Sequence, residues 1–386
     1  MLNKAANRLL PLSFVGFCFC IGISIGLLIK LGKIQASDSR SVPVEVVPLP
    51  KISLPPATQE ELFNDTLTIQ AVGDIIPGTN YPDNRLPSHR NKLIPKSVRS
   101  HLQRADILFG NFESSLTNHP YSSKDITQGQ TFAFRSPPSY AKLFSEVGFD
   151  VLNIANNHAM DFGNVGFKDT VKNLENVNIA TVGHKNQILL LSGNKIPVAM
   201  IGFAPYKQYN SIHDLQTATK LVKTAQEKAK IVIVSMHAGA EGTNALRTKN
   251  QTEFFYGENR GNSVNFARKM IDAGADLVLG HGPHVPRAME IYQGKLIAYS
   301  LGNFLGYRTL STTGETGDSM ILEIKLKGSG ELAAAKIVPI RMDKRGIPHI
   351  DQRFRVISLL RNLMAADFPK TAVTINRQGE IVLASK

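Results

Sequence analysis

The pattern of hydrophobic and polar positions from residue 66 onwards predicts short buried strands separated by helices. The runs rich in Val and Ile are almost continuously apolar, as expected when both faces of a sheet are covered. They predict strands over Leu67–Val72, Ile107–Phe109, Val151–Ala155, Val198–Phe203, Ile231–Met236, Leu277–Leu279 and Leu296–Leu301. Apolar residues spaced three and four apart predict helices over 140–147, 167–174 and 266–271. This alternation predicts an α/β domain with helices on both sides of the sheet.

The C-terminal part of the pattern changes to two longer strands and one helix. Met320–Leu326 and Ala334–Ile340 are predicted to form a hairpin around a glycine-containing turn at 327–331. Apolar residues from Phe354 to Met364 then repeat with helical spacing. The pattern does not show how this last helix attaches to the core. We therefore place the main domain at 66–345 and a C-terminal extension at 346–386.

The N-terminal segment 1–35 contains a stretch long enough to cross a membrane. Residues 9–29 carry no charge, and as a helix they would extend roughly 31 Å, about the thickness of the hydrocarbon core. The run is longer than the apolar part of a secretory signal and lacks a small-x-small cleavage site. We expect one uncleaved transmembrane helix in the cell membrane, with the main domain on the extracytoplasmic side. A cleaved signal is the alternative.

Residues 36–65 are interpreted as a linker because they are rich in proline. Pro43, Pro48, Pro50, Pro55 and Pro56 fall within fourteen positions, a density that favours an extended polyproline II spacer. The alternative is a proline-bearing edge strand, since apolar residues alternate over 42–49. The proline density argues against the strand.

Composition and charge narrow the function classes. The 386 residues are 42% hydrophobic and 19% charged, which excludes wholesale disorder. Both cysteines, Cys18 and Cys20, lie in the N-terminal apolar run, so a disulfide scaffold and a Cys-ligated metal site are excluded. The net charge of +13 favours an anionic partner such as an acidic polymer or anionic lipid. Nucleic acid is not expected, because the chain has no Trp and no nucleic-acid-binding motif.

Polar residues follow six of the predicted strands at the point where each strand ends. In chain order the strand ends carry Asp74, Asn111 with Glu113, Asn156-Asn157-His158 with Asp161, His237 with Glu241, His281 with His284, and Asn303. Ligands bind beyond the carboxyl ends of the strands in open α/β sheets. Asp, Asn, Glu and His at one such edge would form a cluster of metal-ligand types. The sequence therefore predicts a shared polar site that holds a divalent metal ion.

Each of these residues also has an explanation without function. Gly-Asp after a strand is more often a turn or a helix N-cap than a ligand. His237 could be a hydrogen-bonded core histidine, and Asn303 could cap a turn. Independent turns have no reason to repeat this chemistry at one edge, so the combination favours the shared site.

The motifs in this order resemble the bacterial CapA family of capsule-synthesis proteins, linked to poly-γ-glutamate, within the calcineurin-like metallophosphoesterase superfamily. The matching runs are Gly-Asp-Ile-Ile-Pro-Gly (73–78), Gly-Asn-Phe-Glu-Ser-Ser-Leu-Thr (110–117), Phe-Arg-Ser-Pro-Pro (134–138), Ala-Asn-Asn-His-Ala-Met-Asp-Phe-Gly (155–163), Ser-Met-His-Ala-Gly-Ala-Glu (235–241), Gly-His-Gly-Pro-His-Val (280–285) and Tyr-Ser-Leu-Gly-Asn-Phe (299–304). The resemblance implies a four-layer αββα sandwich of the metallophosphoesterase type, with the site at its upper edge.

The resemblance also implies roles for individual residues. Metal ligands would be Asp74, Asn157, His237, His281 and His284, with Asn111 at the place where the superfamily has a bridging Asp. His158 would be the catalytic histidine, Asp161 its carboxylate partner, and Glu113 a further ligand or a base. The chain departs from the superfamily pattern, because Asn111 is neutral and no His follows Asp74 two positions on. One metal ion is therefore expected rather than two, and a metal-free site is the alternative.

These interpretations together predict a membrane-anchored protein for the synthesis, attachment or export of an extracellular anionic polymer. As an enzyme it would be a metal-dependent hydrolase or transferase, with His158 as the general acid. The alternative is a non-catalytic subunit that binds the polymer and associates with other capsule-synthesis membrane subunits. A phosphoesterase or nuclease activity would follow from superfamily analogy alone.

Overall fold

The computed structural model describes residues 45–48, 66–371 and 373–383. Within this part of the chain no helix combines the length and the apolar character needed to cross a bilayer. The predicted anchor at 9–29 lies outside the described residues and stays a prediction. So does most of the predicted linker at 36–65.

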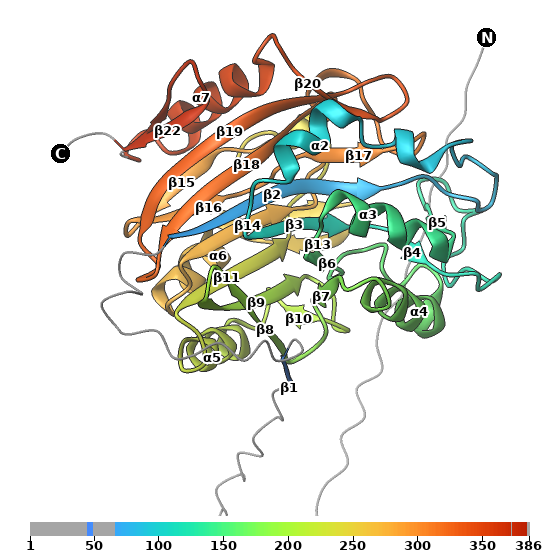
Figure 1. Ribbon diagram of the computed structural model, residues 1–386, viewed down its shortest axis with the longest axis horizontal. Helices are drawn as coiled ribbons and strands as arrows, with labels where there is room; N and C mark the ends of the chain where they lie inside the picture. The colour runs from blue at the N-terminus through green and yellow to red at the C-terminus, as the bar shows by residue number, and fades with distance from the viewer. Residues whose placement is uncertain (1–44, 49–65, 372, 384–386) are drawn as a thin grey trace, which may run out of the picture. The chain divides into compact units, whose positions relative to one another are not determined.

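The first of two large sheets is built from the middle of the chain (Figure 1). Its strand order is β1-β8-β9-β11-β14-β16-β15, with β10 beside β9. The bounds are β1 Glu45–Pro48, β8 Gln187–Gly193, β9 Ile196–Ala204, β10 Asn210–Ser211, β11 Ile231–His237, β14 Leu277–His281, β15 Met289–Tyr292 and β16 Lys295–Ala298. The central strands β9, β11, β14 and β16 are parallel.

The second sheet combines the beginning of the domain with its C-terminal part. Its order is β21-β22-β19-β18-β2-β3-β6-β7, with β17 beside β2 and β20 beside β19. The bounds are β2 Thr66–Ile76, β3 Ile107–Phe112, β6 Val151–Asn153, β7 Ala180–Val182, β17 Asn303–Gly306, β18 Asp318–Lys327, β19 Leu332–Met342, β20 Pro348–Ile350, β21 Val373–Ile375 and β22 Glu380–Leu383. Two small pairs complete the strands, namely β4 Ser115–Leu116 with β5 Arg135–Ser136, and β12 Glu253–Phe255 with β13 Glu258–Gly261.

Helices cover the outer faces of the two sheets. α5 (Leu215–Gln226) and α6 (Ser263–Asp272) pack on the first sheet, where Asp214 and Asn262 cap their N-termini by accepting a backbone N–H. The second sheet carries the helices α2 Lys96–Leu102, α3 Ala141–Val147 and α4 Gly163–Glu175. The layers therefore follow the order helix, sheet, sheet, helix, and the expected α/β class is confirmed.

Alternation along the strands explains this layering. In β2, Leu67, Ile69 and Ala71 point into the core between the sheets, whereas Val72 and Ile75 pack with the helices on the other side. Because both faces of the central strands are covered, the strands are apolar almost throughout. The seven predicted strands are all present, and so is the predicted hairpin, as β18 and β19.

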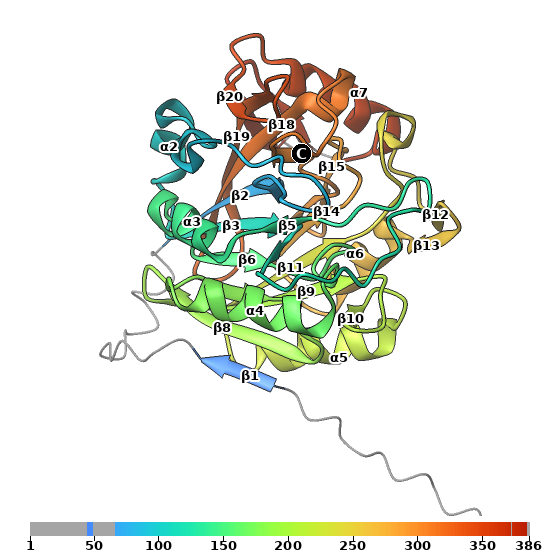
Figure 2. The same cartoon turned by 90° about the vertical axis from the view of Figure 1, so that its right-hand side faces the viewer.

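Two expectations are corrected. Glu45–Pro48 is not a polyproline II spacer but an edge strand, which pairs in parallel with β8. Pro48 is tolerated at the end of this strand because an edge strand does not need every N–H. The polar strand ends also do not share one sheet, since β2, β3 and β6 belong to one sheet and β11 and β14 to the other. The carboxyl ends of both sheets meet at one side of the domain (Figure 2).

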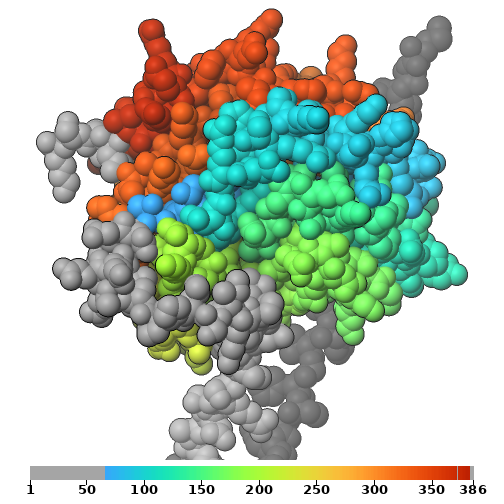
Figure 3. All heavy atoms as spheres, viewed as in Figure 1, coloured from blue at the N-terminus to red at the C-terminus, as the bar shows by residue number. Residues whose placement is uncertain are grey.

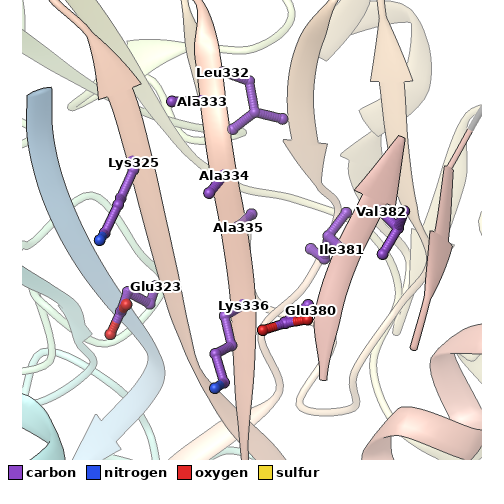
Figure 4. A pocket seen from close by; sticks show the side chains of 10 residues that line it. All are labelled: Glu323, Lys325, Leu332, Ala333, Ala334, Ala335, Lys336, Glu380, Ile381 and Val382. Carbon is purple, nitrogen blue, oxygen red and sulfur yellow. The ribbon is translucent and has the colours of Figure 1, made fainter. Parts of the chain in front are cut away.

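The C-terminal helix α7 (Arg355–Asp367) attaches to β18, β19 and β15. It packs Val356 and Leu360 on the inner face of the second sheet, next to Ile337. The outer face of β18, β19 and β22 forms a trough of about 560 Å³ (Figure 4). This trough is lined by small and charged residues such as Ala334, Lys325 and Glu380, and holds no cluster of metal-ligand or nucleophilic groups.

Candidate metal and acid–base site

The strand ends bring the predicted site residues into register across both sheets. Asp74 of β2 pairs with Asn111 of β3, and Asn111 pairs in turn with Asn153 of β6. In the other sheet His237 of β11 pairs with His281 of β14. The two sheets are joined here, because His281 donates from Nε2 to the carbonyl oxygen of Val72 at 3.2 Å.

The backbone before Asp74 is held close to the segment that enters β17. Asp74 donates its N–H to the carbonyl oxygen of Gly302 at 2.9 Å. A Cβ atom on Gly73 would lie 1.8 Å from that same oxygen, so only glycine allows this approach. The glycine of the Gly-Asp motif thus fixes where the carboxylate of Asp74 points.

Asp74, Glu113 and His284 form the centre of the site. One ligand-type atom from each lies within 4.8 Å of the others. His284 donates from Nδ1 to Asn303 Oδ1 at 2.8 Å and lies 3.1 Å from Asp74 Oδ2. Its Nε2 faces Glu113 and Glu241 at 3.8 and 3.7 Å. His284 has a φ of 59°, in the left-handed region, which histidine adopts more readily than most residues other than glycine.

The protonation of this cluster follows from burial and mutual charge. Burial raises the pKa of Glu113 well above its usual value, and the carboxylates of Asp74 and Glu241 add to the effect, although His284 opposes it. For His284 burial acts to lower the pKa, but Glu113, Asp74 and Glu241 outweigh it and raise the pKa to about 10. Burial acts to raise the pKa of Asp74, but the interaction with His284 outweighs burial and lowers this pKa to about 2.

The residues present fit a divalent metal ion. Among the described residues, both carboxylate oxygens of Glu113 are buried without a hydrogen-bond partner. The same holds for Nδ1 of His237, Nδ1 of His281 and Oδ1 of Asn157. Buried polar atoms without partners are costly, and these five are all metal-ligand types. Asp74, Glu113 and His284 would hold the ion, with His237 and His281 next to them.

Asn111 has a different place from the one its motif position implies. Its Nδ2 donates to Asp74 Oδ1 at 2.8 Å. Its Oδ1 accepts from Asn153 Nδ2 at 2.8 Å and from Asn156 Nδ2 at 3.1 Å. The only ligand atom of Asn111 is thus engaged in a buried amide network that positions Asp74.

His158 forms a second, acid–base part of the site together with Asp161. The Nδ1 atom of His158 lies 2.9 Å from Asp161 Oδ2, and the ring of Phe134 packs on the imidazole with centroids 4.5 Å apart. Lys124 lies 2.6 Å from the other oxygen of Asp161 and 3.3 Å from His158 Nδ1. Burial, followed by the charge of Lys124, lowers the pKa of His158. The neutral imidazole therefore predominates at neutral pH, contrary to the role of a ready proton donor.

A buried arginine lies beside His237. The Nη2 atom of Arg260, from β13, is 2.7 Å from Glu241 Oε1 and 3.4 Å from His237 Nε2. Burial, followed by this arginine, lowers the pKa of His237 well below its usual value. The hairpin β12–β13 that carries Arg260 is tied down by Arg287, which donates to both oxygens of Glu253 at 2.8 and 2.7 Å.

Sequence reasoning missed Lys124, Arg260 and Asn153. Lys124 and Arg260 come from a loop and a small hairpin rather than from the ends of the predicted strands, so the strand-end rule could not find them. Asn153 is inside the predicted strand 151–155, and an uncharged Asn in an otherwise apolar run is a signal that could have found it.

The protein is thus an α/β sandwich with a buried cluster of Asp, Glu and His side chains beside a His–Asp pair. Such a cluster has the side-chain types that bind a divalent metal ion. The family described as bacterial capsule synthesis protein PGA_cap matches residues 68–308, and the chain belongs to this family. It is 30% identical to the PGA biosynthesis protein CapA of Bacillus subtilis (strain 168), over 69% of this chain and 70% of that one. It is 28% identical to the capsule biosynthesis protein CapA of Bacillus anthracis, over 82% and 80% of the two chains.

Among solved structures, the chain is similar to a 5'-nucleotidase precursor from Thermus thermophilus. The TM-score is 0.42 at 12% identity, over 78% of this chain and 59% of that chain.

Proposed function

We propose that this chain is a metal-dependent hydrolase or transferase that acts on an anionic capsule polymer of the poly-γ-glutamate type. The names of the two CapA relatives support the polymer and the process, namely capsule or PGA biosynthesis. The apolar run at 9–29 supports a membrane anchor that holds the domain outside the cytoplasm, next to the growing polymer.

The observation that carries the proposal is the environment of Glu113. Its side chain is fully buried, neither oxygen has a hydrogen-bond partner among the described residues, and Asp74 and His284 supply two more ligand atoms within 4.8 Å. A site that only braced the fold would have no reason to bury an unpartnered carboxylate next to a second one.

The charges of the site favour one divalent ion over two. With an ion bound and Glu113 deprotonated, the carboxylates of Asp74, Glu113 and Glu241 would carry three negative charges, and the guanidinium of Arg260 carries one positive charge. If the histidines are neutral, the remaining two negative charges are balanced by one divalent ion. A second ion at His237 would meet the guanidinium of Arg260, which is only 3.4 Å from the ring.

The acid–base chemistry falls to His158. A bound divalent ion would polarise the carbonyl or phosphoryl oxygen of the bond to be cleaved. With Nδ1 engaged by Asp161, Nε2 is the ring atom left to meet substrate. Because its pKa is lowered, neutral His158 takes a proton from the attacking nucleophile and then returns it to the leaving group. This order, base before acid, replaces the general-acid role expected from the sequence.

Metal content and turnover test the proposal together. Full-length protein purified in detergent should hold close to one equivalent of a divalent metal by elemental analysis, and Asp74→Ala should lose it. His158→Asn should keep the metal and lower cleavage of poly-γ-glutamate at least ~100-fold, the usual contribution of an acid–base group. A wild-type protein that binds the polymer but cleaves neither it nor a phosphoester with any metal supplied is a binding subunit, and the proposal then fails.

A further inference from the structure

A strongly basic surface borders the carboxyl end of β2. The segment 85–104, which includes α2, contains Arg85, Arg90, Lys92, Lys96, Arg99 and Arg104 but no Asp or Glu. Lys92 and Lys96 are exposed and Arg90 is half-buried. Arg104 lies apart from them, because the chain after α2 returns to the amino end of β2, where His101 accepts from Gln70 and Asp106 donates to Thr68. In the space-filling view this segment (cyan) lies on the face toward the viewer and adjoins the C-terminal third of the chain (orange; Figure 3).

The neighbouring segments add further basic groups and a hollow. The hollow measures about 140 Å³ and is lined by His89 and Lys92 from one side and by Tyr307, Arg345 and His349 from the other. Ligand pockets usually measure ~300–1,000 Å³, so this hollow fits one anionic group of a longer chain rather than a whole small molecule. The hollow and segment 85–99 together are called the basic surface below.

Most of these charges are not neutralised by the protein. Asp343 pairs with Arg345 at 3.4 Å and with His349 at 3.6 Å, and Asp83 lies 3.7 Å from Arg85. Within the described residues no ion pair is formed by Arg90, Lys92 or Lys96. Cations that the fold does not pair are available to an external anion.

The basic surface is connected to the metal and acid–base site through the backbone. β2 carries Asp74 and ends at Ile76, whose carbonyl oxygen accepts the N–H of Tyr307 at 3.1 Å. Arg308 donates its N–H to the carbonyl oxygen of Arg345 at 2.9 Å, and Arg85 donates to that of Thr79 at 2.7 Å. The hollow is lined by three segments, namely 87–95, the chain around Tyr307, and 345–349. These segments are therefore held at the end of the strand that carries Asp74.

We propose that the basic surface binds the carboxylates of an anionic polymer chain and guides it to the site at Asp74, Glu113 and His284. This inference rests on the proposed function for the identity of the polymer. A membrane surface is the other polyanion to consider. Large exposed hydrophobic residues, which insert into membranes, are absent from 85–104, 306–310 and 343–349 in the described chain, and this favours the polymer.

The test compares two triple variants with the same change in net charge. Arg90→Glu, Lys92→Glu and Lys96→Glu reverse the basic surface. Lys220→Glu, Lys223→Glu and Lys228→Glu reverse exposed lysines in and just after α5, which covers the other sheet. Binding of fluorescently labelled poly-γ-glutamate to full-length protein in nonionic detergent is followed by anisotropy. Because each basic group near an anionic surface contributes roughly a factor of five, we expect about 100-fold weaker binding for the first variant and little change for the control.

Metal content separates this inference from the proposed function. Both triple variants should retain the metal of the wild type, since neither touches Asp74, Glu113 or His284. Equal polymer affinity in the two variants would overturn the inference while leaving the metal site intact. A second outcome would also overturn it. If the basic-surface variant binds the polymer normally but no longer binds mixed micelles that contain phosphatidylglycerol, the surface contacts the membrane and not the polymer.

Discussion

Glu113→Gln should change the stability of this protein in opposite directions with and without metal. In metal-free protein the substitution removes the charge of a fully buried carboxylate whose two oxygens have no hydrogen-bond partner among the described residues. With metal present, the same substitution removes one of three ligands. The order of stability of the two proteins should therefore invert when metal is added.

The magnitude and pH dependence follow from the burial of Glu113. The ordinary pKa of a glutamate side chain is 4.5, and in the folded protein the pKa of Glu113 is raised well above it. At pH values above about 4.5 the folded state therefore binds more protons than the unfolded state. The stability of the metal-free wild type should accordingly fall as pH rises from about 4.5, and this loss should be absent from the Gln variant. At pH 8 the variant should be more stable by about 1–3 kcal/mol, the cost of an unsatisfied buried polar group.

Calorimetry in chelator and in excess metal measures both effects. In chelator at pH 8, the variant should unfold roughly 2–4 °C higher for each kcal/mol gained. In metal at ~1,000 times the dissociation constant, the wild type gains about 4.1 kcal/mol, more than the variant's advantage of about 1–3 kcal/mol, and should become the more stable protein. Glu227→Gln, an exposed residue at the end of α5, is the control and should show neither effect. A Glu113→Gln protein that is less stable under both conditions would show that Glu113 braces the fold instead.

Two further predictions concern protons and location. Metal binding should release protons and become tighter as pH rises from 6 to ~9, because His284, with a pKa of about 10, must lose its proton to become a ligand. Titration calorimetry in buffers of different ionisation enthalpy counts the released protons. A metal affinity that does not change with pH would show that His284 is not a ligand. Full-length protein should stay with membranes after an alkaline carbonate wash, whereas a shortened mature form in the medium would indicate a cleaved signal.

The strands of the fold could be predicted because their chemistry is local. A strand covered on both faces must be apolar throughout, and each such run, for example Ile231–Met236, could be recognised without its neighbours. Grouping the strands into sheets could not be predicted in the same way. β2 pairs with β18 some 250 positions later in the sequence, and nothing in Leu67–Val72 distinguishes this partner from another apolar run.

The polar residues at the strand ends were found for the same local reason, whereas the charges that set their chemistry were not. Lys124 lies within a loop of ordinary composition, yet its ammonium lies 2.6 Å from Asp161 and helps to keep His158 neutral. Without that distance the unperturbed pKa of histidine suggested a proton donor. The protonation of His158 thus depends on a contact between positions 34 residues apart, which no pattern along the chain encodes.

Arg260 shows how such a contact also bears on the proposed number of metal ions. His237, taken alone at the end of β11, is an ordinary candidate ligand. The structure places the guanidinium of Arg260 3.4 Å from its Nε2 and holds it there through Glu241 and through the hairpin that Arg287 fastens by way of Glu253. A positive charge fixed at that point disfavours a cation at His237 and leaves the carboxylates of Asp74 and Glu113 as the place where one divalent ion is best balanced.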